Sequence, residues 1–171
     1  SHPCSHLDAG QYTDDMQQFI LLVQSLIQKK KFDVFDFGKR IGEWAYKCQT
    51  IQNYNRFAGG TSLTAGMKLY EGKNPLTTGI SIATCGSTMR VGPLGMFYRK
   101  NINQLTEAAT LASIVTHNHQ AAVDSAIFIS HLIAYLSNDA TVEEAVQKSR
   151  ELVQSDLKLL TQIEKDFGSF E

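Results

Sequence analysis

The chain has 171 residues, of which 43% are hydrophobic and 19% are charged, and its formal net charge is -1. These values predict one compact soluble domain over residues 1–171, and the balanced charge argues against a surface that binds nucleic acid or an anionic membrane. The three cysteines form no C-x-x-C pair, and no apolar run is long enough to span a membrane, so we expect a reducing, cytoplasmic setting.

Thr13, Asp14 and Asp15 stand at the start of an apolar pattern with helical spacing. The pattern comprises Met16, Phe19, Ile20, Val23, Leu26 and Ile27. Capping is the ordinary interpretation, because Thr and Asp oxygens accept hydrogen bonds from the free N–H groups at a helix start and their charge suits the helix dipole. A metal site is the alternative, because hydroxyl and carboxylate oxygens are typical ligands of Mg²⁺, Mn²⁺ or Ca²⁺. Three such ligands do not complete an octahedral shell.

Two further helices are predicted in the next part of the chain. The first spans about Val34 to Cys48, with Asp33 or Asp36 near its start. Its apolar stripe consists of Phe37, Ile41, Trp44, Ala45 and Cys48. The second is short, is capped by Thr61, carries Leu63, Met67 and Tyr70 on one face, and ends at the segment 71–75.

Residues 77–95 are rich in Gly, Ser and Thr and do not resemble a helix interior. Glycines allow a backbone to approach a ligand closely, and exposed N–H groups that lead into a helix form a concave anion site. A plain connector, with Arg90 in a structural pair, is the alternative interpretation.

The C-terminal part again shows helical spacing. We predict helices over Leu105 to Val115 and Ala121 to Leu136, the second apolar on nearly all sides. A capping box, Thr141-Val142-Glu143-Glu144, opens the last segment, whose apolar positions continue through Leu160 and Ile163. Since no useful period-two alternation appears, the sequence predicts an all-α fold.

The polar cluster Thr116-His117-Asn118-His119 separates two of these helices. Two histidines two positions apart point to different sides of a helix, so they are a poor chelating pair. They are better suited to donating hydrogen bonds or to lying flat against a sugar or base, and capping or core histidines are the alternative.

Three sequence segments occur in a recognisable order: G-x-Y-T-D-D at 10–15, C-G-S-T-M-R-V-G-P-L-G at 85–95 and T-H-N-H at 116–119. In this combination the chain resembles the ADP-ribosylglycohydrolase family, the relatives of dinitrogenase reductase-activating glycohydrolase, over roughly residues 10–150. The resemblance implies a compact multi-helix all-α fold, with two Mg²⁺ or Mn²⁺ ions at the bottom of a cleft. A water there attacks the anomeric carbon of ADP-ribose and cleaves an N- or O-glycosidic bond to a protein side chain or small molecule.

The resemblance also implies roles for individual residues. Thr13, Asp14 and Asp15 match the first metal-binding segment, and Asp14 or Asp15 would hold the attacking water or take its proton. A second group matches the segments that bind ADP-ribose or an ADP-ribosylated protein. It consists of Cys85, Gly86, Ser87, Met89, Arg90 and His117.

Parts of the family pattern are absent from the sequence. The helix with a G-D-A-L-G-like segment and the G-D-x-D-T/S segment have no match here, so the second ion's ligands are not found and the domain resembles one truncated at both ends. Three explanations stay open: a fragment, a site completed by a homodimer copy or partner chain, or loss of catalysis. The alternative function is therefore a catalytically inactive module that binds ADP-ribose or a protein.

Overall fold

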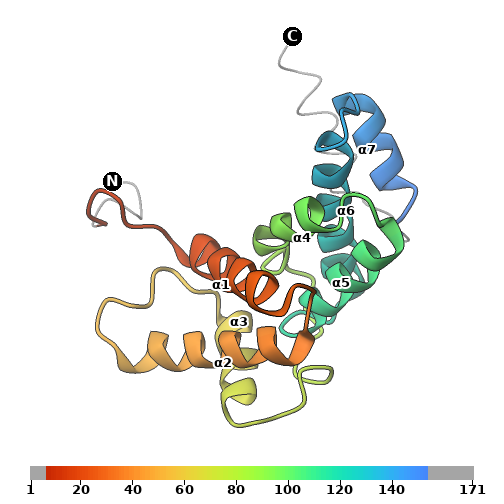
Figure 1. The fold of residues 1–171 in the computed structure, drawn as a ribbon. Coiled ribbons are helices and arrows are strands. Elements are labelled where there is room, and N and C mark those ends of the chain that lie inside the picture. The colour runs from red at the N-terminus through yellow and green to blue at the C-terminus, as the bar shows by residue number, and fades with distance from the viewer. Residues whose placement is uncertain (1–6, 154–171) are drawn as a thin grey trace.

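Seven α-helices form the part of the protein that the structure describes, residues 7–153 of a computed structural model (Figure 1). No strand occurs within this range, so the all-α prediction is confirmed. No helix in it has the length and apolar character needed to cross a membrane. The helices are α1 (Asp14–Lys29), α2 (Val34–Thr50), α3 (Gly60–Tyr70), α4 (Gly92–Phe97), α5 (Ile102–Ile114), α6 (Gln120–Leu136) and α7 (Val142–Arg150), with a 3-10 turn η1 at Thr88–Arg90.

Two groups of helices meet along α1. Helix α2 packs on α3 in one group, and α6 packs on α4, α5 and α7 in the other. Helix α1 contacts α2, α4 and the η1 turn, and it lies between the two groups in Figure 1. The α6 helix is therefore covered on several sides within the chain, which agrees with its nearly uniform apolar sequence.

The prediction for α2 is confirmed in detail. Asp33 is its N-cap and accepts hydrogen bonds from the backbone N–H groups of Phe35 and Asp36, both at 3.0 Å. All five residues of the predicted apolar stripe are buried. Their spacing places them on one face, which packs against α3 and α1.

Helix α3 differs from the prediction in its start and in its buried face. It begins at Gly60 with Gly59 as the N-cap, not with Thr61 as the cap. The predicted face is half-buried or exposed, and the buried face consists of Ser62, Ala65, Gly66 and Leu69. Small residues face α2 because the helices lie very close: a Cβ at Gly66 would be 2.5 Å from the Ala45 Cβ.

Helix α1 also buries an unexpected face. Met16 and Ile27, which belong to the apolar pattern, are 43% and 71% exposed. Gln17 and Gln18 are buried instead: the Gln17 amide has partners for both its oxygen and its nitrogen, and the Gln18 oxygen accepts from Arg90.

The helices after residue 100 begin close to their predicted starts. Asn101 caps α5 by accepting from the Gln104 N–H, and His119 caps α6 by accepting from the Ala121 N–H. The capping box of α7 is present, with Thr141 as N-cap. Leu160 and Ile163 lie outside the described residues.

The connector after α3 contains two elements that the sequence did not predict, η1 and α4. Helix α4 lies directly on α6, since a Cβ at Gly95 would be only 2.2 Å from the Ser130 carbonyl oxygen. Earlier in the connector, the Ile80 N–H donates to the Thr116 carbonyl and the Ile80 carbonyl accepts from the Asn118 N–H, both at 3.0 Å. These contacts join the connector to the segment between α5 and α6.

The side chain of Arg90 is completely buried where these elements meet. Its guanidinium donates to the Gln18 side chain of α1 at 2.6 Å, and to the Ala112 carbonyl and the Thr116 hydroxyl at 2.7 Å each. It also lies 5.3 Å from the Phe37 ring centroid of α2. Burial lowers the pKa of Arg90 to about 9, so the group remains a cation at neutral pH.

Replacing Arg90 by Met should lower the free energy of unfolding by about 3 to 5 kcal/mol, because several buried oxygen acceptors lose their donor. Urea unfolding at pH 7 measures this change. The matched control is Arg99→Met, since Arg99 is exposed and makes one 3.4 Å bond to the Met96 carbonyl. We expect a change within about 0.5 kcal/mol there. Equal losses in both variants would contradict the structural role of Arg90.

Candidate functional site

Thr13, Asp14 and Asp15 form the first turn of α1, as predicted, but Thr13 does not cap the helix through its side chain. Its hydroxyl donates to the Asp15 carboxylate at 3.3 Å instead. Asp14 is only 7% exposed, whereas Asp15 is exposed. The capping interpretation therefore does not account for the Thr13 side chain.

Asp14 is held in an environment that disfavours its negative charge. Burial, and then the nearby charge of Asp15, raise the pKa of Asp14 from 3.8 to about 6, and hydrogen bonds from the backbone, including that of Gly59, oppose the rise. A cation bound between the two carboxylates would relieve both unfavourable effects. The Thr13, Asp14 and Asp15 oxygens are hard ligands, which suits Mg²⁺ or Mn²⁺.

These three residues provide only part of a metal shell. Within residues 7–153, no three His, Cys, Asp or Glu side chains come together as a potential ion site. The second ion's ligands are not identified in the sequence, and the metal itself stays a prediction.

Arg56 fixes the turn that precedes α1. The Asp14 N–H donates to the Arg56 carbonyl at 3.0 Å, and the Arg56 guanidinium donates to the Tyr12 carbonyl at 3.1 Å. The same guanidinium lies 5.3 Å from the centroid of the Tyr12 ring. Arg56 thus contacts the backbone on both sides of Thr13, and no periodic pattern in the sequence predicts this contact.

Gln17 fixes the next turn of α1. Its amide donates to the Tyr54 carbonyl at 3.0 Å and accepts from the Trp44 indole N–H at 2.9 Å. Trp44 is 1% exposed and belongs to the core of α2. The acidic turn is therefore supported by the buried Trp44 of α2 and by the loop that follows α2.

The second and third segments lie directly against each other. A Cβ at Gly86 would be 2.7 Å from the His117 Nε2, so the loop backbone lies close against the imidazole and a larger residue would require His117 to shift. Ser87 is buried and shares a 2.8 Å hydrogen bond with the Ser113 hydroxyl of α5. Cys85 is an exposed free thiol, and Met89 is half-buried.

His117 is 1% exposed and its Nδ1 lies 2.7 Å from the Thr116 hydroxyl. Burial, and then the positive charge of Arg90, lower the pKa of His117 from 6.5 to about 4. The imidazole is therefore neutral at pH 7. Its role in substrate binding stays a prediction, as does that of Arg90, whose described hydrogen bonds all go to protein oxygens.

Arg90 joins the three segments. It lies in the second, donates to Thr116 in the third, and donates to Gln18, one helical turn after Asp14 and Asp15. The start of α3 adds a second connection, because Gly59 bonds to Asp14 and the Ser62 hydroxyl would be 3.7 Å from a Cβ at Gly86. The sequence did not indicate Gln17, Gln18 or Arg56 as part of this arrangement.

The low pKa of His117 predicts a loss of stability in acid. Between pH 6.5 and about 4 the unfolded chain binds a proton at this position and the folded protein does not, so the contribution of His117 to the free energy of unfolding falls as the pH falls. The loss is on the order of 2 to 3 kcal/mol. The raised pKa of Asp14 contributes with the opposite sign in both wild type and variant, so the comparison with a His117 variant isolates the histidine. Urea unfolding across this range should therefore show a steeper fall for the wild type than for His117→Gln. Parallel profiles would contradict the neutral, buried imidazole.

Sequence comparisons identify related proteins. The profile of the ADP-ribosylglycohydrolase family matches residues 2–169. A protein of Archaeoglobus fulgidus, named only as uncharacterized, is 30% identical over 146 residues, which are 85% of this chain and 46% of that protein.

Two proteins named ADP-ribosylarginine hydrolase Tri1 are also similar. The one from Serratia proteamaculans is 24% identical and the one from Pseudomonas putida is 26% identical, over 81% and 82% of this chain. Those matches cover 39% and 38% of the two relatives, so the chain spans less than half the length of the relatives it matches. Because the family profile covers nearly the whole sequence, the chain belongs to the ADP-ribosylglycohydrolase family.

Proposed function

We propose that this chain contributes the first metal-binding turn and part of the substrate cleft of a hydrolase that releases ADP-ribose from arginine side chains. The observation that carries the proposal is the pair of adjacent carboxylates at the start of α1, one buried with a raised pKa and the other exposed. Family membership supports the glycosidic bond as the bond that is cleaved. The names of the two Tri1 relatives support arginine as the acceptor.

The chemistry follows from the donor set of this turn. Thr13, Asp14 and Asp15 would hold Mg²⁺ or Mn²⁺, which supplies Lewis-acid charge that makes water a better nucleophile. Asp14 would accept a proton of the attacking water, whose oxygen forms a bond to C1 of the ribose. The bond from C1 to the arginine nitrogen breaks, and the leaving guanidine takes up a proton. The hydroxyl of Thr13 orients the Asp15 carboxylate.

A second candidate function has an observation of its own. Only two carboxylates meet at the α1 turn within the described residues, which is fewer than two divalent ions need. The second candidate function is therefore a catalytically inactive module that binds ADP-ribose or a protein. Titration of ADP-ribose with Mn²⁺ and again with chelator, together with hydrolysis of an ADP-ribosylated arginine peptide, distinguishes the two: the inactive module binds without hydrolysis.

Asp14→Asn and Asp15→Asn should each weaken Mn²⁺ binding about tenfold or more and lower the hydrolysis rate about a hundredfold, because each removes a charged ligand or the proton acceptor. Calorimetry and arginine-peptide release measure the two effects. Asp139→Asn is the matched control, since Asp139 is exposed, lies after α6, and has a positive φ of 63° that Asn tolerates. Wild-type Mn²⁺ affinity in both site variants would show that the metal assignment is wrong.

Arg56→Ala should weaken Mn²⁺ binding about tenfold, because the turn that presents Asp14 and Asp15 loses its fixed position. Arg56→Lys retains a cation that reaches the Tyr12 carbonyl and should recover part of the affinity. The expected loss of stability is small, since the Arg56 side chain is half-buried and near the surface. Equal Mn²⁺ affinities of wild type and Arg56→Ala would show that Arg56 does not support this turn.

A further inference from the structure

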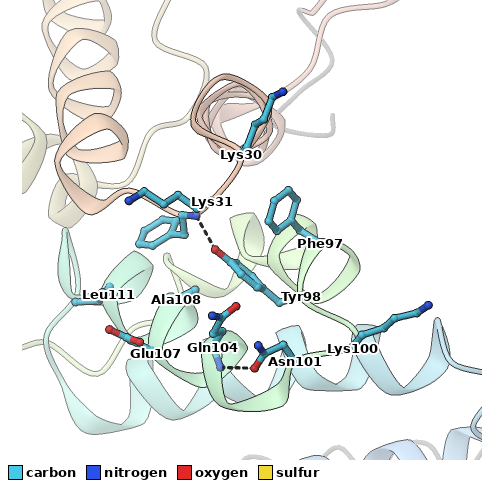
Figure 2. A pocket seen from close by; sticks show the side chains of 11 residues that line it. Lys30, Lys31, Phe97, Tyr98, Lys100, Asn101, Gln104, Glu107, Ala108 and Leu111 are labelled. Carbon is cyan, nitrogen blue, oxygen red and sulfur yellow. Dashed lines mark hydrogen bonds between the residues drawn. The ribbon is translucent and has the colours of Figure 1, made fainter.

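A separate cavity of about 570 Å³ lies at the C-terminal end of α1 (Figure 2). The 16-residue helix places this end roughly 24 Å from the acidic turn at its start. The cavity is formed by residues 30–32 directly after α1, by residues 97–101 at the end of α4 and after it, and by the first three turns of α5. None of the predicted site residues lines it.

Two basic segments that are far apart in the sequence meet around this cavity. Lys30 and Lys31 come from the end of α1, and Lys100 comes from the turn before α5. In the part of the chain that the structure describes, none of these three lysines forms an ion pair, whereas Lys29 lies 3.9 Å from the Asp36 carboxylate. Glu107 is the one acidic residue among the described lining residues. The cavity is therefore positively charged in a protein whose formal net charge is -1.

Two aromatic rings line the cavity, and one of them is held by a hydrogen bond. The Tyr98 hydroxyl accepts a hydrogen bond from the Phe32 N–H at 2.6 Å, which holds the tyrosine ring across the cavity. The Phe97 ring meets the Tyr98 ring edge to face, with centroids 4.9 Å apart. Flat apolar walls of this kind suit a planar ring in a ligand.

The cavity also offers a free polar group. Figure 2 shows the Gln104 side-chain amide next to the Tyr98 ring, and this amide has no hydrogen bond to any other described residue. The amines of Lys30, Lys31 and Lys100 extend from the rim in different directions in the same view. A planar ring against Tyr98 would leave the anionic group of the ligand at this rim, where the flexible lysine side chains can turn toward it.

We propose that this cavity binds a nucleoside 5′-phosphate, with the base against Tyr98 and Gln104 and the phosphate at the lysine rim. The volume falls in the range of small-molecule sites. The free amide supplies both a donor and an acceptor for the edge of a base, and ammonium groups are effective partners of phosphate. This site does not use Asp14, Asp15 or a divalent ion, so it stands independently of the proposed hydrolase function.

Calorimetric titration of AMP, adenosine and inorganic phosphate into the full chain, in chelator, tests the proposal. AMP should bind more tightly than either adenosine or inorganic phosphate, and its affinity should fall as salt is added. Lys31→Ala/Lys100→Ala should weaken AMP binding about tenfold or more, and Gln104→Ala should weaken AMP and adenosine binding alike.

Two controls locate the binding. Lys39→Ala/Lys68→Ala removes two exposed lysines from α2 and α3, and it should leave the AMP affinity unchanged, as should Asp14→Asn. Unchanged AMP affinity in the rim variant, equal affinities for AMP and adenosine, or no binding at millimolar AMP would each overturn the proposal. Loss of AMP binding in Asp14→Asn would also overturn it, because the ligand would then occupy the α1 turn.

Discussion

The buried guanidinium of Arg90 is the interaction on which the rest of the arrangement depends. Taking a cation out of water is costly, and the cost is offset only where several oxygen atoms surround it in good geometry. Here the partners are neutral: an amide from α1, a carbonyl from α5 and a hydroxyl from the segment before α6. Each must stay within hydrogen-bond distance of one planar group. The positions of three separate elements are fixed together as a result.

This constraint also shapes the candidate site. The η1 turn that carries Arg90 follows the Gly86 loop, and Gly86 lies close against the His117 imidazole. Arg90 in turn keeps His117 neutral by adding its charge to the effect of burial on the pKa. The hydrogen bond between Arg90 and Gln18 positions α1 relative to the buried guanidinium. Gln17 and Arg56 hold the first turn of α1. The acidic turn is therefore presented by a rigid scaffold, which is what a metal site requires.

The sequence predicted the elements that have strong local signals. The stripe of α2, the apolar α6 and the capping box of α7 each follow from periodicity or a capping pattern. The buried faces of α1 and α3 could not be predicted in this way. Helix α3 buries small residues because Gly66 allows close packing on α2. Helix α1 buries two glutamines that bond to Trp44 and Arg90, and the distance of these partners in the sequence made the burial unpredictable.

In the candidate site, too, local sequence patterns were predictable and long-range contacts were not. The T-D-D triplet and the glycine-rich loop are visible as local patterns, but the contact between Gly86 and His117 and the support from Arg56 depend on the tertiary fold. Helix α2 was predictable because its signals come from residues that are close together in the sequence. The hydrogen bonds of Arg90 were not, because they join residues that are far apart in the sequence. Neither the sequence nor the structure provides a complete set of metal ligands, because the described residues bring only two carboxylates together.

The central claim is that Thr13, Asp14 and Asp15 hold a divalent cation, and anomalous diffraction from a Mn²⁺-soaked crystal of the chain tests it most directly. We expect an anomalous peak within about 2.0 to 2.6 Å of oxygen atoms of Asp14 or Asp15, the range of hard-cation bonds to oxygen. A fully soaked crystal with no peak at this turn, or with manganese only at other surface carboxylates, would contradict it.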